Sequence, residues 1–474
     1  MPFGRTAGSL AAVERKWWTL LAVCVGTFML LLDITVVNVA LPDIERDLHA
    51  SFAELQWVVD AYSLSLASLV LTAGALADLL GRKRVFAVGL GLFTVASLGC
   101  GLAPSAVALD VLRAFQGVGG AVMFATALAL IAQEFHGRER GTALGIWGAT
   151  IGGAVAIGPL IGGVLTDGLS WQWIFYVNVP IGIAAVVLTL TKLQESRDPN
   201  ARGIDWWGAV TFSASLFLLV FGLIRANDDG WGSARIVGCL VASTALLVAF
   251  VLVERRRERP MLDLTLFRKP TFAGASIAAF TLSASMFAMF LYLTLYIQNV
   301  LGYSPLEAGV RFLPITVLSF VAAPISGRLS ARVPVRALLF VGLALVGTGL
   351  LLMSGLKVGS DWTHLLPGFL IAGAGIGMVN PALASSAIGV VAPQRSGMAS
   401  GINNTFRQVG IATGIAALGA IFQSQAGAAQ NVSPSAFVDA LNHILVVSAI
   451  VAYAGAVLSV ALVRGSDFVA PAGA

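Results

Sequence analysis

Residues 74–84 read GALADLLGRKR, and residues 327–336 read GRLSARVPVR. Each stretch ends a long apolar run in a basic turn, which indicates that the chain contains two related halves. A half with six membrane-spanning helices needs only the chain from about 17 to 193. The second stretch begins roughly 70 residues later than a direct repeat would place it, which is enough chain for two further spans.

The composition is that of a polytopic membrane protein. Of the 474 residues, 57% are hydrophobic and 11% are charged, and the mean hydropathy is +0.87. Soluble domains carry about 25% charged residues, so most of this chain is expected to lie in lipid. The net charge is +5, but the basic residues cluster in short loops. The positive-inside bias explains this clustering, and nucleic-acid binding is therefore not expected.

Apolar segments of about 20 residues predict an all-α fold with fourteen transmembrane helices. They lie near 17–41, 55–77, 85–103, 107–131, 142–166, 174–193, 205–225, 235–253, 271–298, 305–329, 335–356, 363–391, 401–423 and 440–464. We expect two six-helix bundles, 17–193 and 271–464, and an inserted helix pair at 205–254. The other segments are an N-terminal tail (1–16), a linker (194–204), a basic linker (255–270) and a C-terminal tail (465–474).

Loop charge predicts the orientation of these spans. The loops on one side hold most of the basic residues, including Arg82, Lys83 and Arg84, whereas the loops on the other side hold few. This bias predicts that both termini lie in the cytoplasm. The membrane is expected to be the plasma or inner membrane of the cell. The N-terminal segment lacks the short apolar region and cleavage site of a secretion signal, so the first helix is expected to remain as an anchor.

Several motifs are similar to those of one transporter family. GALADLLGRKR resembles the signature loop between helices two and three of the major facilitator superfamily, and LDVLRAFQGVGGA (109–121) resembles its helix-four motif. LDITVVNVALP (32–42), WQWIFYVNVPIG (171–182) and SGMASGINNTFRQVG (396–410) resemble the fourteen-helix branch of its drug:proton antiporters. The resemblance implies that two bundles rock about a central cavity and export hydrophobic, often cationic compounds in exchange for protons.

The signature loop supplies a candidate cytoplasmic gate, formed by Gly74, Asp78, Gly81, Arg82, Lys83 and Arg84. Asp78 could pair with the basic cluster or cap the N-terminus of a neighbouring helix, and such a charge latch would hold the two halves together. The alternative is a basic turn that only sets topology. The second stretch has Ala331 in the place of Asp78, so a latch there would be weaker.

The stretch GATIGGAVAIGPLIGGVL (148–165) resembles the helix-five motif of the family's exporters. Its candidate residues are Gly148, Gly152, Gly158, Pro159, Gly162 and Gly163. Glycines spaced by three and four residues allow helices to approach closely, and Pro159 predicts a kink. The motif is interpreted either as a contact that bends while the halves exchange or as helix packing alone.

Three ionisable residues are predicted at similar depth in the first bundle. Asp33 lies eight residues, about 12 Å, from the end of its span, and Asp60 and Arg113 each lie six residues into theirs. Because a buried charge is costly unless it is paired, we expect these groups to face the bundle interior. Our hypothesis makes Asp33 the proton-coupling carboxylate, tuned by Arg113; the alternative is a fixed ion pair. Asp60 is either a second proton or cation site or an outer acid that reaches water.

Aromatic and polar residues supply candidates for a greasy substrate cavity with cation–π capacity. Each aromatic could equally face lipid or pack. Glu307 and Arg311 are favoured as a structural pair over a gate, and Arg407 either snorkels to the cytoplasmic face or lines the cavity. The full set is Trp57, Tyr62, Phe115, Gln116, Trp147, Phe287, Phe290, Tyr292, Glu307, Arg311, Asn403, Asn404 and Arg407.

Motifs for enzymatic chemistry are missing from the sequence. No P-loop, HExxH or GxSxG pattern occurs, and the three cysteines (Cys24, Cys100 and Cys239) lie apart within apolar runs. We therefore expect a monomeric transporter without cofactor or metal that is driven by the proton gradient and handles hydrophobic or cationic small molecules. The alternatives are an exporter dedicated to one metabolite, antibiotic or lipid, and a receptor or scaffold that keeps the fold without transport.

Overall fold

A computed structural model describes residues 7–50, 52–197, 205–257, 262–330, 332–392, 395–426 and 433–468, and every regular element in these ranges is helical. The first half contains α1 (Ala7–Leu48), α2 (Phe52–Leu80), α3 (Arg82–Gly101), α4 (Ala106–Glu134), α5 (Gly137–Gly168), α6 (Trp173–Tyr176) and α7 (Asn178–Lys192). The inserted pair is α8 (Trp206–Asp229) and α9 (Ala234–Arg256). The second half contains α10 (Pro270–Leu295), α11 (Pro305–Leu329), α12 (Val335–Met353), α13 (Leu366–Gly389), α14 (Ser396–Ala426) and α15 (Pro434–Leu462). Short helical turns are η1 (Leu264–Arg268), η2 (Tyr296–Val300), η3 (Trp362–Leu365) and η5 (Gly465–Asp467).

The number of long apolar helices agrees with the fourteen spans expected. In the described ranges, 13 helices are long and apolar enough to cross a membrane, and α5 makes the fourteenth if its two bent parts count as one span. The parts 139–155 and 160–166 meet at 43°. The bend lies next to Pro159, which has no amide hydrogen to donate within the helix, so the predicted kink is present.

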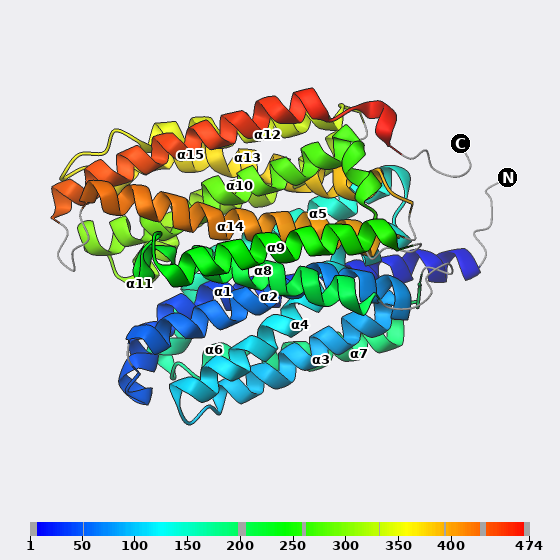
Figure 1. The fold of residues 1–474 in the computed structure, drawn as a ribbon, viewed down its shortest axis with the longest axis horizontal. Coiled ribbons are helices and arrows are strands. Elements are labelled where there is room, and N and C mark those ends of the chain that lie inside the picture. Colours follow the sequence, from blue (N-terminus) through cyan, green and yellow to red (C-terminus); the bar gives the residue numbers. More distant parts are fainter. Residues whose placement is uncertain are drawn as a thin grey trace.

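The inserted pair packs against both halves. Figure 1 shows α8 and α9 in green, with α1, α2, α3 and α4 of the first half on one side and α10, α14 and α15 of the second half on the other, whereas α5 of the first half lies among the helices of the second. α8 contacts both α2 and α14, whereas α9 packs mainly on α8. The start of α1 and the end of α15 lie at the same end of the molecule (Figure 1).

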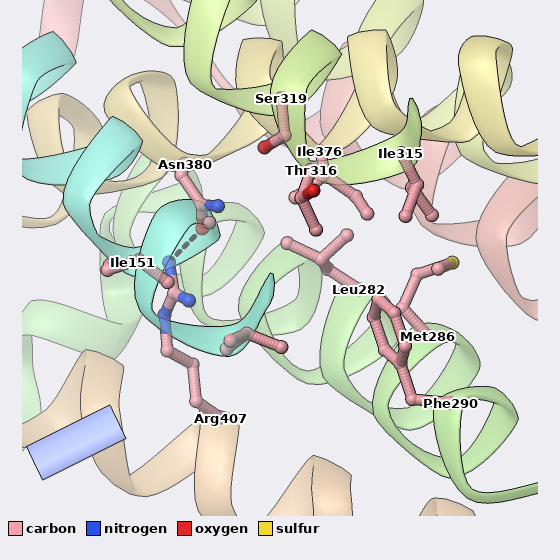
Figure 2. A pocket seen from close by; sticks show the side chains of 12 residues that line it. Ile151, Leu282, Met286, Phe290, Ile315, Thr316, Ser319, Ile376, Asn380 and Arg407 are labelled. Carbon is pink, nitrogen blue, oxygen red and sulfur yellow. Dashed lines mark hydrogen bonds between the residues drawn. The ribbon is translucent and has the colours of Figure 1, made fainter. Parts of the chain in front are cut away.

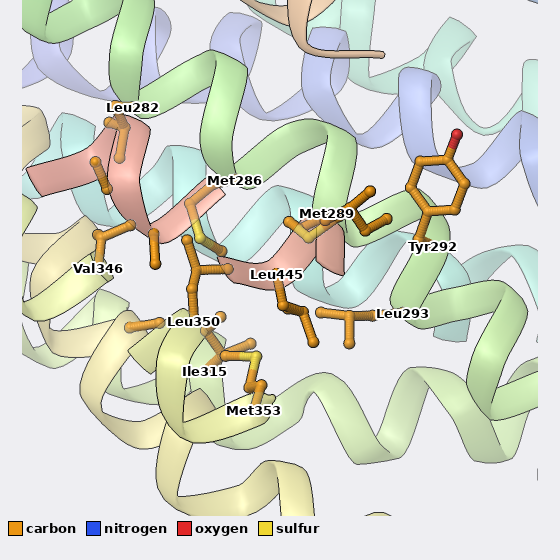
Figure 3. Packing of buried hydrophobic residues seen from close by; sticks show 14 of the residues in the cluster. Leu282, Met286, Met289, Tyr292, Leu293, Ile315, Val346, Leu350, Met353 and Leu445 are labelled. Carbon is orange, nitrogen blue, oxygen red and sulfur yellow. The ribbon is translucent and has the colours of Figure 1, made fainter. Parts of the chain in front are cut away.

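Each half contains its own apolar core. The largest cluster belongs to the second half, where methionine, leucine and tyrosine side chains from α10, α12 and α15 interlock; Figure 3 shows part of it. A second cluster joins α1, α2, α3, α4, α5 and α7, together with two residues of α13. Close-packed interiors transmit strain and resist gradual deformation, so each half can move as a unit.

The two halves meet where small residues let α5 approach α11. A Cβ added at Gly141 would lie less than 3.0 Å from the main chain of Gly327, and one at Gly145 would lie 2.8 Å from the Cα of Pro324. Gly152 similarly faces Ser319. Gly148, between Gly145 and Gly152, faces α13. Farther along the helix, Gly158 and Gly162 face α1, and Gly163 faces the start of α11. The glycine motif therefore serves close helix packing, both between the halves and within the first half.

Candidate functional site

Asp33 of α1 forms the centre of a buried polar network in the first half. Its carboxylate accepts hydrogen bonds from Arg113 Nη1 and from Gln116 Nε2, the latter at 2.8 Å. Asn178 Nδ2 of α7 lies 3.5 Å from the same carboxylate and 3.1 Å from the hydroxyl of Ser97. Asp33 is 2% exposed and Arg113 is 1% exposed. Side chains from α1, α3, α4 and α7 thus form one buried polar network around this carboxylate.

Arg113 is oriented by groups other than the acid. Its Nε donates to the main-chain oxygen of Val58 at 2.9 Å, and Nη1 also donates to Gln116 Oε1 at 2.7 Å. The ring of Tyr62 lies under the guanidinium, 4.4 Å from centroid to Cζ. Because these contacts do not involve Asp33, they can hold Arg113 in place while the charge of its partner changes.

Asp60 is not part of this network. It lies on α2 within electrostatic range of Arg225 and Asp228 of the inserted helix α8. One turn earlier on α2, the ring of Trp57 stacks against Arg225 at 5.4 Å. Of the three groups expected at similar depth, only Asp33 and Arg113 are paired directly, because the face of α2 that carries Asp60 turns toward α8.

At one end of the molecule, Asp78 joins the two halves. It accepts two hydrogen bonds from Arg82, at 2.9 and 2.8 Å, and one each from the amides of Gly397, at 3.2 Å, and Met398, at 2.9 Å. These amides belong to the first turn of α14, where the free N–H groups and the helix dipole favour an anion. Asp78 therefore makes both contacts that the sequence suggested, and it is 7% exposed.

Glycine is required at three places around this latch. A Cβ on Gly397 would collide with the Asp78 carboxylate, and one on Gly74 would lie 2.5 Å from the oxygen of Gly397. Gly81 has a φ of 111°, a conformation that glycine adopts without strain. The Glu195 carboxylate accepts hydrogen bonds from the amides of Lys83 and Arg84 and thereby caps α3. Ala331, in the second stretch, lies outside the described residues.

A cavity lies where α5 of the first half faces α10, α11, α13 and α14 of the second. It contains about 480 Å³ of space between atoms, counting the space at its mouth. Figure 2 shows Arg407 reaching Asn380, whose Oδ1 accepts a hydrogen bond from Arg407 Nη2 at 2.8 Å. The lining is otherwise mostly apolar: Ile151, Gly152, Val155, Leu282, Met286, Phe290, Ile315, Thr316, Ser319 and Ile376. Arg407 therefore lines the cavity, which was one of its two alternatives, and does not extend to the cytoplasmic face.

Of the residues proposed for a cavity, Phe290 and Arg407 line this one, and the side chain of Phe287 is outside the described residues. The other aromatics have different surroundings. Phe115 is 53% exposed on the lipid side, and Trp147 is buried, donating to Thr27 Oγ1 at 3.0 Å. Tyr292 stacks on Phe422 inside the core of the second half. As described above, the ring of Trp57 contacts Arg225 of α8. The Asp33 network includes Tyr62 and Gln116.

The polar candidates of α11 and α14 also lie elsewhere. The Glu307 carboxylate accepts from the amide of Ser304 in a capping box, while Arg311 donates to the main-chain oxygen of Glu307 at 2.8 Å and stacks on Tyr303. The two residues are therefore in contact at the start of α11, but through the main chain of Glu307 and not through an ion pair of their side chains. Asn404 donates to the main-chain oxygen of Phe124 across the two halves, and Asn403 is buried beside it.

Sequence reasoning missed four polar residues of these sites: Ser97, Asn178, Ser319 and Asn380. Asn178 lies in a stretch that resembled the antiporters, and an asparagine inside an apolar span would have singled it out. Ser97 and Ser319 gave no such signal, because a serine can satisfy itself on the preceding helical turn. Asn380 precedes Pro381 inside α13, and its partner is brought to it only by the packing of α14.

Comparison with known proteins places this architecture in a family. The sequence model of the Major Facilitator Superfamily matches residues 23–415, and the chain belongs to that family. The chain is 37% identical to the tetracenomycin C resistance and export protein of Streptomyces glaucescens over 414 residues, which is 87% of this chain and 77% of that protein. It is also 37% identical to the puromycin resistance protein pur8 of Streptomyces alboniger over 438 residues, 90% of this chain and 87% of that protein.

A further relative is the multidrug resistance protein Stp of Mycobacterium tuberculosis, 37% identical over 404 residues, 85% of this chain and 75% of that protein. Among solved structures, the human organic anion transporter MFSD10 (TETRAN) superposes with a TM-score of 0.67, covering 94% of this chain and 99% of that one. At 15% identity, this likeness shows the fold alone. The chain is thus a multi-pass membrane protein of a transporter family.

Proposed function

We propose that the protein exports hydrophobic small molecules, including drugs or antibiotics, in exchange for protons. The relatives that span most of the chain are named for export of or resistance to such compounds. The observation that supports proton coupling is the Asp33 network. It holds a carboxylate away from bulk water and surrounds it with several hydrogen-bond donors. No cofactor takes part in this proposal, and the working unit is one chain.

The exchange would proceed by alternating access. With both termini in the cytoplasm, the Asp78 latch lies on the cytoplasmic side, and this conformation is closed to the cytoplasm. Opening requires that Asp78 leave the first turn of α14 and that α5 separate from α11. Protonation of Asp33 weakens its charge attraction to Arg113, and such a change can bias one arrangement of the helices over the other.

The test is transport into everted membrane vesicles. Puromycin, tetracenomycin C and the neutral dye N-phenyl-1-naphthylamine serve as test compounds, and a protonophore should abolish their uptake. With purified protein, adding a transported compound should release protons for the wild type but not for Asp33→Asn. Asp60→Asn tests the second candidate acid, and Asp229→Asn, which alters an exposed carboxylate at the end of α8, is the control.

Two results would end the proposal. If Asp33→Asn folds and still supports protonophore-sensitive uptake at the normal rate, then Asp33 does not couple transport to protons. If the wild type moves none of the compounds, the chain is not an exporter of this class. Uptake of one compound alone would identify a dedicated exporter rather than a multidrug pump.

A further inference from the structure

The cavity between the halves has a charged end and an apolar end. In the view of Figure 2, Arg407 and Asn380 lie together at one end, and Met286 and Phe290 lie at the other. Arg407 is 5% exposed and Asn380 is 2% exposed, so the charge is held away from bulk water. Among the described lining residues, Arg407 is the only charged one.

Two hydrogen-bond donors at the charged end of the cavity have no acceptor among the described residues. A guanidinium has five N–H donors and no acceptor, and Arg407 Nη2 donates to Asn380 Oδ1. Arg407 Nε and the hydroxyl of Ser319, both buried, have no partner among the described residues. No described carboxylate forms an ion pair with Arg407. Buried donors without acceptors are uncommon in proteins, and these two are available to an acceptor that enters the cavity.

We propose that this cavity binds substrates that carry an acidic group, such as a carboxylate, sulfonate or ionised phenol, on an apolar aromatic body. The anion accepts hydrogen bonds from Arg407, and the ring system fills the space along Leu282, Met286 and Phe290. Asn380 keeps the guanidinium turned toward the cavity. A cationic compound finds no carboxylate among the described lining residues and would be placed against a buried positive charge.

This inference gives the substrate class of the export proposed above, but its test measures binding alone. The probes are 8-anilino-1-naphthalenesulfonate and N-phenyl-1-naphthylamine, which share one aromatic body and differ by the sulfonate. Both fluoresce on entering an apolar site. Binding is measured with protein in phosphatidylcholine nanodiscs, after subtracting the signal of empty discs.

We expect Arg407→Gln to weaken binding of the sulfonate about tenfold or more, since a charge-assisted contact is lost, and to change binding of the neutral probe less than about twofold. Asn380→Asp should also weaken binding of the sulfonate, because the new carboxylate would form an ion pair with the guanidinium. Arg311→Gln is the control, an arginine of the same half outside the cavity. Binding of the neutral probe also shows that each variant is folded.

The proposal would be overturned if Arg407→Gln weakened the binding of both probes equally. Unchanged binding of the sulfonate by Asn380→Asp would overturn it as well. If Arg407→Gln does not fold, Arg407→Lys and Asn380→Asp decide the question by the same ratio of the two affinities. Vesicle transport separates this inference from the proposed function. Selective binding without proton-driven uptake leaves the site standing and removes the exporter, whereas uptake without selective binding does the reverse.

Discussion

A single methyl group added to α5 should open the protein at the latch end. In Gly145→Ala, the new Cβ would lie 2.8 Å from the Cα of Pro324 and 2.9 Å from the oxygen of Ala323, both main-chain atoms of α11. Carbon atoms in ordinary contact are about 3.5–4.0 Å apart, so the helices must separate by about 1 Å. The matched control is Gly153→Ala on the same helix, where the nearest atom is a carbon of the Phe320 ring at 3.7 Å.

The size of the effect follows from the difference between these two variants. Both gain the same helix propensity from alanine, about 1 kcal/mol, so that term cancels. Overpacking costs about 1–3 kcal/mol, and only the conformation in which α5 touches α11 is penalised. The population of that conformation relative to the separated one should therefore fall about 5- to 150-fold in Gly145→Ala and stay near the wild-type value in Gly153→Ala.

The assay follows a cysteine placed at the end of α11. Ser330→Cys is made after the three native cysteines are replaced, and its reaction with a membrane-impermeant maleimide is timed in everted vesicles. We expect labelling of Gly145→Ala to be at least about fivefold faster than labelling of Gly153→Ala. Equal rates in the two variants would refute the view that glycine at this contact controls separation of the halves.

Three further predictions concern charged contacts. Arg113→Gln should lower the free energy of unfolding by about 3–5 kcal/mol by leaving Asp33 without its counter-charge, and adding Asp33→Asn should restore part of this loss in thermal unfolding; additive losses would argue against the pair. Asp78→Ala removes two charge-assisted hydrogen bonds to α14, each about 1.5–3 kcal/mol, and should speed the same maleimide labelling; an unchanged rate would exclude a latch. Burial acts to raise the pKa of Asp263, but hydrogen bonds from Thr265 and the Arg395 guanidinium hold this pKa below its ordinary value, so this contact stabilises the fold above about pH 4 and is lost as pH falls through the folded pKa. Asp263→Asn should therefore lower the melting temperature at pH 7, and this effect should shrink as the pH falls below about 4. An effect that does not change with pH would contradict this.

The sequence could predict features that depend on one helix or on depth in the membrane. Hydropathy locates the spans because each must cross the same apolar thickness. Depth along the helices brought Asp33 and Arg113 together correctly, because an acid and a base buried at one level in one bundle have few other partners. The cap on α14 was similarly foreseeable from the position of Asp78 at the end of its span.

What the sequence could not predict is the direction in which each side chain faces between helices. Phe115 and Gln116 are neighbours on α4, yet one faces lipid and the other the Asp33 network, and no spacing decides which. Asp60 was grouped with Asp33 by depth, but the inserted helix α8 offers Arg225 to it. The cavity lies between helices of both halves, so its lining depends on how complete bundles dock.

The charges of the two sites lie on different halves, Asp33 on the first and Arg407 on the second. Under the proposed exchange, a proton entering the cell and an organic anion leaving it carry current in the same direction. The membrane voltage then adds about 2.3 kcal/mol per charge at 100 mV to the driving force, whereas for a monovalent cation the two charges cancel. Such a pump would keep working after the acidity difference across the membrane has disappeared, provided that the voltage remains.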